Sequence, residues 1–174
     1  MSRVMSFLLL ISIASMVDAQ GDASAKKGKF VSEKGRFSVK FPGRVRSQVQ
    51  EVETAFGKMK SNIEAFTLGQ NMMLMVVYCD LPPAAKADPS TVFENIKPSA
   101  KGFDGVIVKD EGLTFGPDKL PARRLLVRKE NNMMVRNLII LKDERIYQVI
   151  VMGPGGLIGE KRAEEFVSSF EITK

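Results

Sequence analysis

Three apolar runs followed by one amphipathic segment fill residues 121–170, and this stretch constrains the fold more than any other part of the chain. The runs cover residues 122–129, 133–141 and 145–152. Apolar runs of this length, bounded by polar turns, are typical of strands, and Asn131 and Asn132 tolerate the positive φ of a hairpin. The apolar residues of the next segment recur at helical spacing: Ala163, Phe166, Val167 and Phe170. We expect a strand meander with a helix packed on it.

A second group of strands is predicted before residue 80. Phe37, Val39 and Phe41 alternate with polar residues, which is the period of a strand. The run MMLMVVY at residues 72–78 is apolar throughout, as expected for a central strand buried on both faces. Two further strands are expected before it, at residues 44–54 and 58–67.

A helix is predicted from residue 88, between the two groups of strands. Asp88 is suited to its N-cap and Pro89 to its first position, while Pro98 is expected to break or kink it. Strands and a helix, followed by strands and a helix, favour the α+β class. We expect one antiparallel β-sheet with two helices packed against it.

The amino terminus has the pattern of a cleaved signal peptide. Arg3 precedes an apolar run at residues 5–17, which is shorter than the roughly 20 residues that span a bilayer. Small residues allow cleavage after Ala19 or after Ala25. We expect a secreted or periplasmic protein without a transmembrane segment after cleavage. The predicted parts are a signal peptide at 1–19, a flexible leader at 20–29 and a single α+β domain at 30–174.

The composition removes several kinds of chemistry. The chain has no histidine, so the commonest general base and metal ligand is missing. Its single cysteine, Cys79, cannot form an internal disulfide, and its apolar setting predicts a buried, inert thiol. The net charge of +6 suits an anionic partner, but the charges are spread along the chain. We expect no cofactor and no metal.

Two end motifs resemble those of small exported proteins of the Mog/PsbP-like class. GRFSVKFP at residues 35–42 is similar to their opening strand, and RIYQV at 145–149 with AEEFVSSF at 163–170 is similar to their closing strand and helix. The resemblance implies an antiparallel sheet between helices, an αβα sandwich. It also implies a non-catalytic accessory or binding role, and it transfers no site residues.

Arginines are concentrated in the stretch at residues 121–170. If the strands pair as predicted, several of them share one face and form a basic surface for a partner, either an acidic protein or an anionic envelope surface. The candidate residues are Arg123, Arg124, Arg128, Arg136 and Arg145. An ordinary solvated sheet face is the alternative. Nucleic acid is not an expected partner, because aromatic residues are not interleaved with these cations.

Two other groups of residues have the chemistry of possible sites, but their positions favour structural roles. Loop acids are expected to act as caps and turn residues: Asp88, Asp104, Asp110, Glu111 and Asp118. Methionines on the predicted strands are expected to pack in the core rather than bind a soft metal: Met72, Met73, Met75, Met133 and Met134.

The sequence therefore favours an exported, non-enzymatic binding or accessory domain. Two alternatives stay open. One is an exported hydrolase that uses carboxylates or a Ser/Lys pair, since a carboxylate pair can hydrolyse a glycoside without histidine. The other is an adhesion module for anionic surfaces that uses the basic sheet face.

Overall fold

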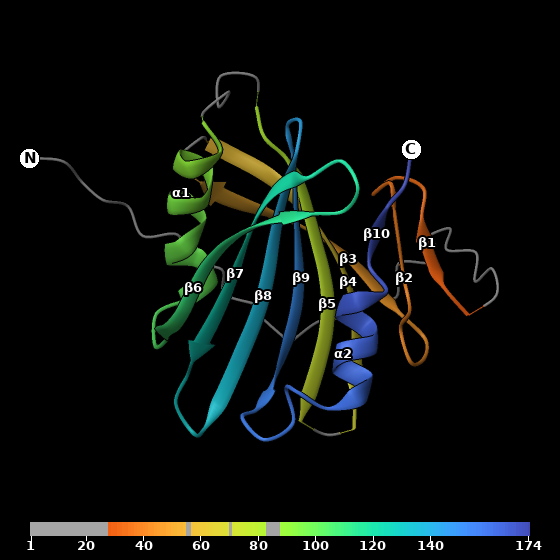
Figure 1. Ribbon diagram of the computed structural model, residues 1–174, viewed down its shortest axis with the longest axis vertical. Coiled ribbons are helices and arrows are strands. Elements are labelled where there is room, and N and C mark those ends of the chain that lie inside the picture. The colour runs from red at the N-terminus through yellow and green to blue at the C-terminus, as the bar shows by residue number, and fades with distance from the viewer. Residues whose placement is uncertain (1–27, 55–56, 70, 83–87) are drawn as a thin grey trace, which may run out of the picture.

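Two antiparallel sheets make up most of the described structure. The computed structural model describes residues 28–54, 57–69, 71–82 and 88–174. In chain order, the strands of the large sheet are β3 (Arg46–Thr54), β4 (Gly57–Leu68), β5 (Met72–Asp80), β6 (Val106–Phe115), β7 (Leu120–Arg128), β8 (Met133–Lys142) and β9 (Arg145–Pro154). Their spatial order is β3-β4-β5-β9-β8-β7-β6 (Figure 1). The predicted antiparallel α+β class is confirmed.

A small second sheet lies beside the large one. It contains β1 (Phe30–Ser32), β2 (Phe37–Val39) and β10 (Glu171–Ile172), with β2 in the middle. The two helices are α1 (Pro89–Lys101) and α2 (Lys161–Ser168). Neither helix has the length and apolar character needed to cross a membrane, as far as the described residues go.

The central strands of the large sheet are buried on both faces, and each face packs on a different helix. Residues that alternate along β5 point to opposite sides: Met75 and Val77 join the core under α1, while Leu74 and Val76 join the core under α2. We call these sides the α1 face and the α2 face. The small sheet also packs on the α2 face, so that face is covered by α2 and the small sheet together (Figure 1). The continuous apolar run of β5 follows from this double burial.

Helix α1 begins at the residue expected from the sequence. The side chain of Asp88 accepts a hydrogen bond from the backbone N–H of Ser90 at 3.1 Å, which caps the helix. Pro98 was expected to break or kink the helix, yet the helix continues to Lys101. It ends where Gly102 takes a positive φ of 67° and donates to the Pro98 carbonyl at 3.0 Å.

The expectation of one sheet was wrong, because the first hairpin and the chain end form the separate small sheet. Strand β10 has only two residues, so it leaves no periodic signal. Aromatic packing joins the small sheet to the end of α2, with the ring of Phe37 5.5 Å from that of Phe170. The glycine at 43 lets the chain pass close to the ring of Phe66, since a Cβ there would lie 2.5 Å from that ring.

Two segment boundaries also differ from expectation. Strand β6 extends through residues 109–115, which places Asp110 and Glu111 inside a strand rather than a loop. The predicted signal peptide and most of the predicted leader lie outside the described residues. Within the described part, Lys29 pairs with Glu171 at 2.8 Å, so the end of the predicted leader belongs to the folded domain.

Candidate ligand-binding site

An ion pair at the end of two central strands organises one end of the molecule. Asp80 of β5 and Arg145 of β9 lie directly opposite each other in the strand register. Arg145 donates from Nε and Nη2 to the two carboxylate oxygens of Asp80, at 2.5 and 2.8 Å. The hydrogen bond from Arg145 holds the pKa of the Asp80 carboxyl below its usual range, so this group stays ionised.

The same arginine anchors the turn between β1 and β2. Its third nitrogen, Nη1, donates to the carbonyl of Lys34 at 2.9 Å, and its guanidinium carbon lies 5.5 Å from the centre of the Tyr78 ring. Tyr147 adds a second anchor by donating its hydroxyl to the carbonyl of Gly35 at 2.9 Å. All three nitrogens of the Arg145 guanidinium are therefore committed within the protein.

The anchored turn presents Arg36 in a fixed backbone position. Arg36 has a φ of 52°, the left-handed region that side chains other than glycine rarely adopt. Its N–H donates to the carbonyl of Glu33 at 3.2 Å, and its own carbonyl accepts from the N–H of Thr173 at 2.9 Å. The first hairpin and the segment after β10 thus hold this residue from both sides.

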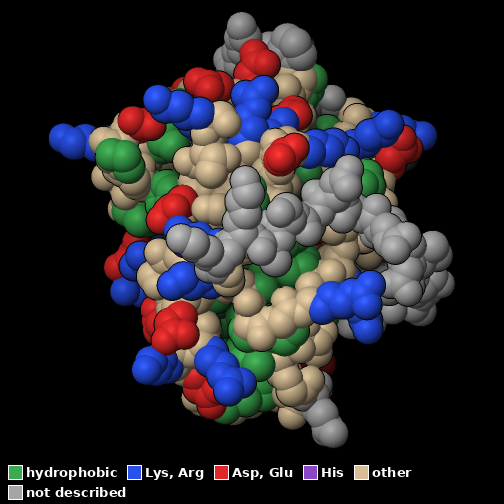
Figure 2. All heavy atoms as spheres, turned by 90° about the vertical axis from the view of Figure 1, so that its right-hand side faces the viewer, with side chains coloured by type: hydrophobic (Ala, Val, Ile, Leu, Met, Phe, Trp, Pro, Cys, Tyr) green, Lys and Arg blue, Asp and Glu red, His purple; other side chains and the backbone are tan. Residues whose placement is uncertain are grey.

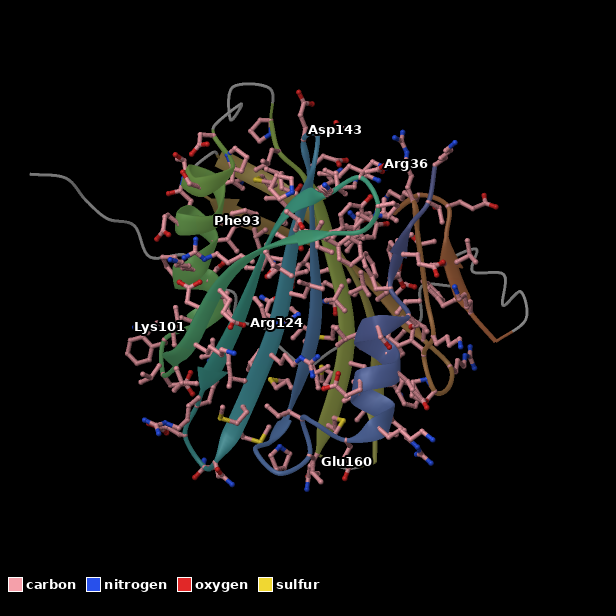
Figure 3. The ribbon with its side chains drawn as sticks, viewed as in Figure 1. Arg36, Phe93, Lys101, Arg124, Asp143 and Glu160 are labelled. Atoms are coloured by element: carbon pink, nitrogen blue, oxygen red, sulfur yellow. The ribbon has the colours of Figure 1, made fainter. Side chains whose placement is uncertain are left out.

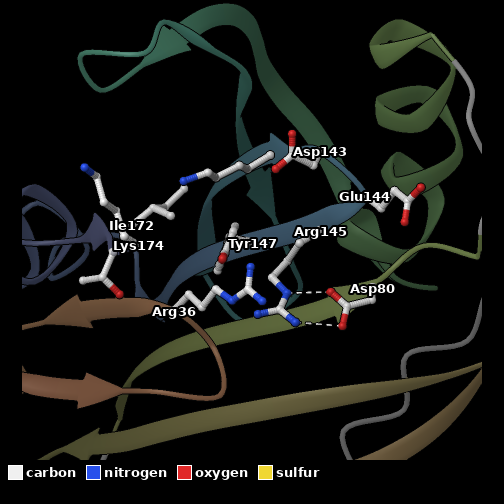
Figure 4. A pocket seen from close by; sticks show the side chains of 10 residues that line it. Arg36, Asp80, Asp143, Glu144, Arg145, Tyr147, Ile172 and Lys174 are labelled. Atoms are coloured by element: carbon white, nitrogen blue, oxygen red, sulfur yellow. Dashed lines mark hydrogen bonds and ion pairs between the residues drawn. The ribbon is translucent and has the colours of Figure 1, made fainter.

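A polar cavity of about 270 Å³ lies next to these contacts, and we call it the turn pocket. It is lined by the β1–β2 turn, the β8–β9 turn, the ends of β5 and β9, and the segment at 172–174 (Figure 4). Its lining residues are Arg36, Asp80, Lys142, Asp143, Glu144, Arg145, Tyr147, Ile172, Thr173 and Lys174. Figure 4 shows the guanidinium of Arg36 beside that of Arg145, with Asp80 on the far side of Arg145.

Some charged side chains of the turn pocket form ion pairs with each other, and others do not. Arg145 and Asp80 neutralise each other. Within the described residues, no ion pair is formed by the cations Arg36, Lys142 and Lys174. Asp143 and Glu144 add two acids in the β8–β9 turn, where Asp143 has a φ of 54°. The pocket therefore offers three uncommitted cations to a small anion, with two acids at one side.

The predicted basic residues do not form one surface. Arg124, Arg128 and Arg136 lie on the α2 face of β7 and β8, because their strand neighbours Ala122 and Leu138 pack in that core. Arg123 lies on the α1 face, where it pairs with Asp110 of β6. Arg145 lies at the other end of the sheet, in the turn pocket.

Acidic partners already occupy most of these arginines. Arg136 pairs with Glu164 of α2, and Arg124 lies 3.8 Å from Glu111. On the side of the molecule with α2 and the small sheet, positive and negative side chains are interspersed (Figure 2). A partner-binding role for the basic sheet face stays a prediction, with Arg128 as its exposed cation that has no ion pair in the described part of the chain.

Several other candidate residues make structural contacts. Burial raises the pKa of the Cys79 thiol to about 11, and the neighbouring Asp80 adds to this effect. Asp104 pairs with Lys129 at 2.6 Å. Met72 and Met75 are buried on opposite faces of β5, as core residues. No group of three or more acidic or cysteine side chains converges as a metal site within the part of the chain that the structure describes.

Sequence reasoning missed most of the turn pocket. Arg36 lies more than 100 residues before Lys142 and Tyr147 in the sequence, and no local pattern links it to them. A signal was present for Arg36, because Lys34, Gly35 and Arg36 form a glycine-containing turn. Comparison with known proteins finds no family model that matches the chain and no curated protein that resembles it.

Proposed function

We propose that this protein is an exported, non-enzymatic binding domain that holds a small organic anion in the turn pocket. The three uncommitted cations Arg36, Lys142 and Lys174 carry the proposal. The ligand class is a small molecule with a carboxylate or phosphate group. Export rests on the amino-terminal pattern, and a relationship to the Mog/PsbP-like class rests on the two end motifs.

Preorganisation of the pocket wall supports this proposal. Arg145 is held by Asp80 and by the Lys34 carbonyl, so it positions the turn that carries Arg36. Arg36 then approaches the pocket with its backbone fixed, and less conformational entropy is lost when it binds a ligand. Arginine suits this role because its planar fork matches the two oxygens of a carboxylate.

Tyrosine fluorescence gives a direct test. The chain has no tryptophan and only two tyrosines, Tyr78 and Tyr147, which both contact the Arg145 network. Titration of the full chain with succinate, inorganic phosphate and neutral glucose should change tyrosine emission with at least one anion and not with glucose. Separate succinate and phosphate titrations identify which anionic group is preferred.

A pair of charge-matched variants locates the ligand. Arg36→Ala should weaken anion binding about tenfold or more, since a charge-assisted hydrogen bond contributes about 1.5–3 kcal/mol. Lys161→Ala removes a cation at the start of α2, next to Glu160 and at the other end of the molecule from Arg36 (Figure 3), and should leave binding unchanged. The proposal is contradicted if neither succinate nor phosphate changes the tyrosine emission. It is also contradicted if Arg36→Ala and Lys161→Ala weaken anion binding equally.

One arrangement favours the alternative of a hydrolase. The hydroxyl of Ser47 donates to the buried carboxylate of Glu64, and burial raises the pKa of that carboxyl. The positive charge of Lys34 is near enough to lower the pKa of this carboxyl, but burial has the larger effect. A Ser-dependent hydrolase predicts turnover of a model ester that Ser47→Ala abolishes. Turnover lost in Ser47→Ala, together with no anion binding, would replace the proposed function with this alternative.

A further inference from the structure

Exposed apolar side chains are concentrated at the start of the edge strand β6. Phe103 is 94% exposed, Val106 is 53% exposed and Val108 is 45% exposed. The other large apolar side chain with comparable exposure in the described residues is Val49, on the opposite edge strand β3. Three such residues within six positions form a local apolar tip, which we call the Phe103 tip.

The turn that carries Phe103 is tightly held. Gly102 ends α1 with a positive φ, and a Cβ at Gly105 would lie 2.1 Å from the carbonyl oxygen of Lys101 and 2.7 Å from Val127. An ion pair of 2.6 Å between Lys129 and Asp104 ties the turn to the end of β7. The aromatic ring between these contacts is thus directed outward by a closely packed backbone.

Positive charge flanks the Phe103 tip. Lys101 is exposed at the end of α1, and Arg128 is exposed directly opposite Val106 in the strand register. Neither cation has an acidic partner among residues 28–54, 57–69, 71–82 and 88–174. Of the nearby acids, Asp104 is neutralised by Lys129, and Glu130 is exposed.

We propose that the Phe103 tip is a docking surface for an anionic lipid bilayer. Phe103 would enter the region between headgroups and acyl chains, while Lys101 and Arg128 contact anionic headgroups. Interfacial association of this kind combines buried apolar area with attraction to anionic lipids. Insertion is shallow, because the outer backbone groups of the edge strand β6 must keep their hydrogen bonds to water.

Other occupants fit this surface less well. A regular added strand on β6 is disfavoured, because the register shift between Ile107 and Lys109 interrupts the edge. The exposed ring of Phe103 beside Lys101 and Arg128 is complementary to the interface of an anionic bilayer, which offers an apolar region next to negative headgroups. The surface is separate from the turn pocket: Lys101 and Arg36 lie far apart at different corners in Figure 3. The inference therefore does not depend on the proposed ligand.

A single tryptophan provides a site-specific test, because the chain contains none. Phe103→Trp in the full chain should show a blue shift of its emission with vesicles of 30% phosphatidylglycerol in phosphatidylcholine. Brominated acyl chains should quench the same emission. The matched control is Val49→Trp, which places the probe on the opposite edge strand and should show neither effect. Both variants contain the same apolar amino-terminal run, so the comparison of Phe103→Trp with Val49→Trp stays valid even if that run also binds vesicles.

Lipid charge and residue charge are tested separately. Vesicles of pure phosphatidylcholine should reduce the fraction of Phe103→Trp that is blue-shifted. Adding Lys101→Ala to that variant should weaken the response to anionic vesicles about fivefold, since a lysine near the surface contributes about 1 kcal/mol. Lys161→Ala, added to Phe103→Trp in the same way, is the charge-matched control and should leave the response to anionic vesicles unchanged.

Three results would overturn the proposal. Emission of Phe103→Trp that is unchanged by anionic vesicles excludes insertion at this site. Equal shifts for Phe103→Trp and Val49→Trp indicate non-specific adsorption. Sedimentation that shows a dimer of the unmodified chain and a monomer of Phe103→Ser assigns the tip to a second copy of the chain instead.

Discussion

Arg145 meets Asp80 through two parallel hydrogen bonds, and its remaining guanidinium nitrogen reaches the carbonyl of Lys34, 111 residues away in the sequence. One side chain thereby joins β5 and β9 of the large sheet to the β1–β2 turn of the small sheet. Its charge is used inside the protein, to assemble the wall of the turn pocket.

Replacing this arginine by lysine should destabilise the protein although the charge is kept. Arg145→Lys cannot reproduce two bonds to Asp80 and a third to Lys34. We expect a loss of about 1–2 kcal/mol in the free energy of urea unfolding, because Asp80 is largely exposed and its ion pair is screened. Arg128→Lys, at an arginine without an ion pair in the described chain, should stay within about 0.5 kcal/mol of the parent. Equal effects would contradict the anchoring role.

Asp110 should contribute to loss of stability in acid. Hydrogen bonds from Arg123 and Lys97 lower its pKa from 3.8 to about 2. Because the folded pKa is depressed, this contribution is complete above pH 3.8 and disappears as pH falls towards about 2. Asp110→Asn should therefore lower stability at pH 6 and differ little from the parent near pH 2.

Urea unfolding at several pH values measures this effect. Asp118→Asn, in the turn after β6, is the control, because Asp118 has no ion pair among the described residues. A constant difference between Asp110→Asn and the parent from pH 6 to pH 2 would show that the carboxylate charge is not the cause.

Glu64 should have the opposite dependence on pH. Burial raises its pKa above 4.5, so its ionisation in the folded protein opposes stability. The contribution of the protonated form is fully present below pH 4.5 and is lost as pH rises through the folded pKa. Glu64→Gln keeps an acceptor for the Ser47 hydroxyl and should become more stable relative to the parent between pH 4 and pH 7.5.

Glu51→Gln, at an exposed position on β3, is the matched control for this comparison, and its stability should follow that of the parent. The hypothesis fails if the stability of Glu64→Gln relative to the parent is lower at pH 7.5 than at pH 4. That outcome would mean that the Ser47 and Lys34 contacts outweigh the cost of burying the carboxylate.

The thiol of Cys79 should react slowly in the folded protein. Its pKa of about 11 compares with an ordinary value of 9.0. At pH 8 this difference reduces the thiolate fraction about a hundredfold, and partial burial limits access further. Reaction with a chromogenic disulfide reagent should be at least about a hundredfold faster in urea than in buffer. Similar rates in both would exclude a protected thiol.

Strand periodicity predicted most of the large sheet because its signals are local. The apolar run of β5 and the alternation of β4 follow directly from which faces are buried. The asparagine turn at 131 and 132, with φ of 55° and 57°, likewise depends on neighbouring residues alone. The small sheet was missed because the pairing of β10 with β2 joins opposite ends of the domain.

The turn pocket could not be predicted either, because its residues come from segments that are far apart in the sequence. Arg145 was predicted as one of five exposed cations, and sequence reasoning had no means to place Asp80 opposite it. The split of Arg123 from Arg124 does follow from strand alternation, because adjacent residues point to opposite faces. The acidic partners Asp110 and Glu164 depend on tertiary packing, so the sequence did not indicate that these arginines were paired.

The late position of β10 also has a consequence for how the protein is made. A chain that has left the ribosome only through Pro154 contains every strand of the large sheet but neither α2 nor β10. The part of the α2 face where Phe166 and Phe170 will pack is then still open to solvent. At this stage the Lys40 N–H lacks its acceptor Ser169 and β2 lacks its partner Glu171. Nascent chains therefore expose apolar sheet residues to chaperones until residues 161–172 have left the ribosome.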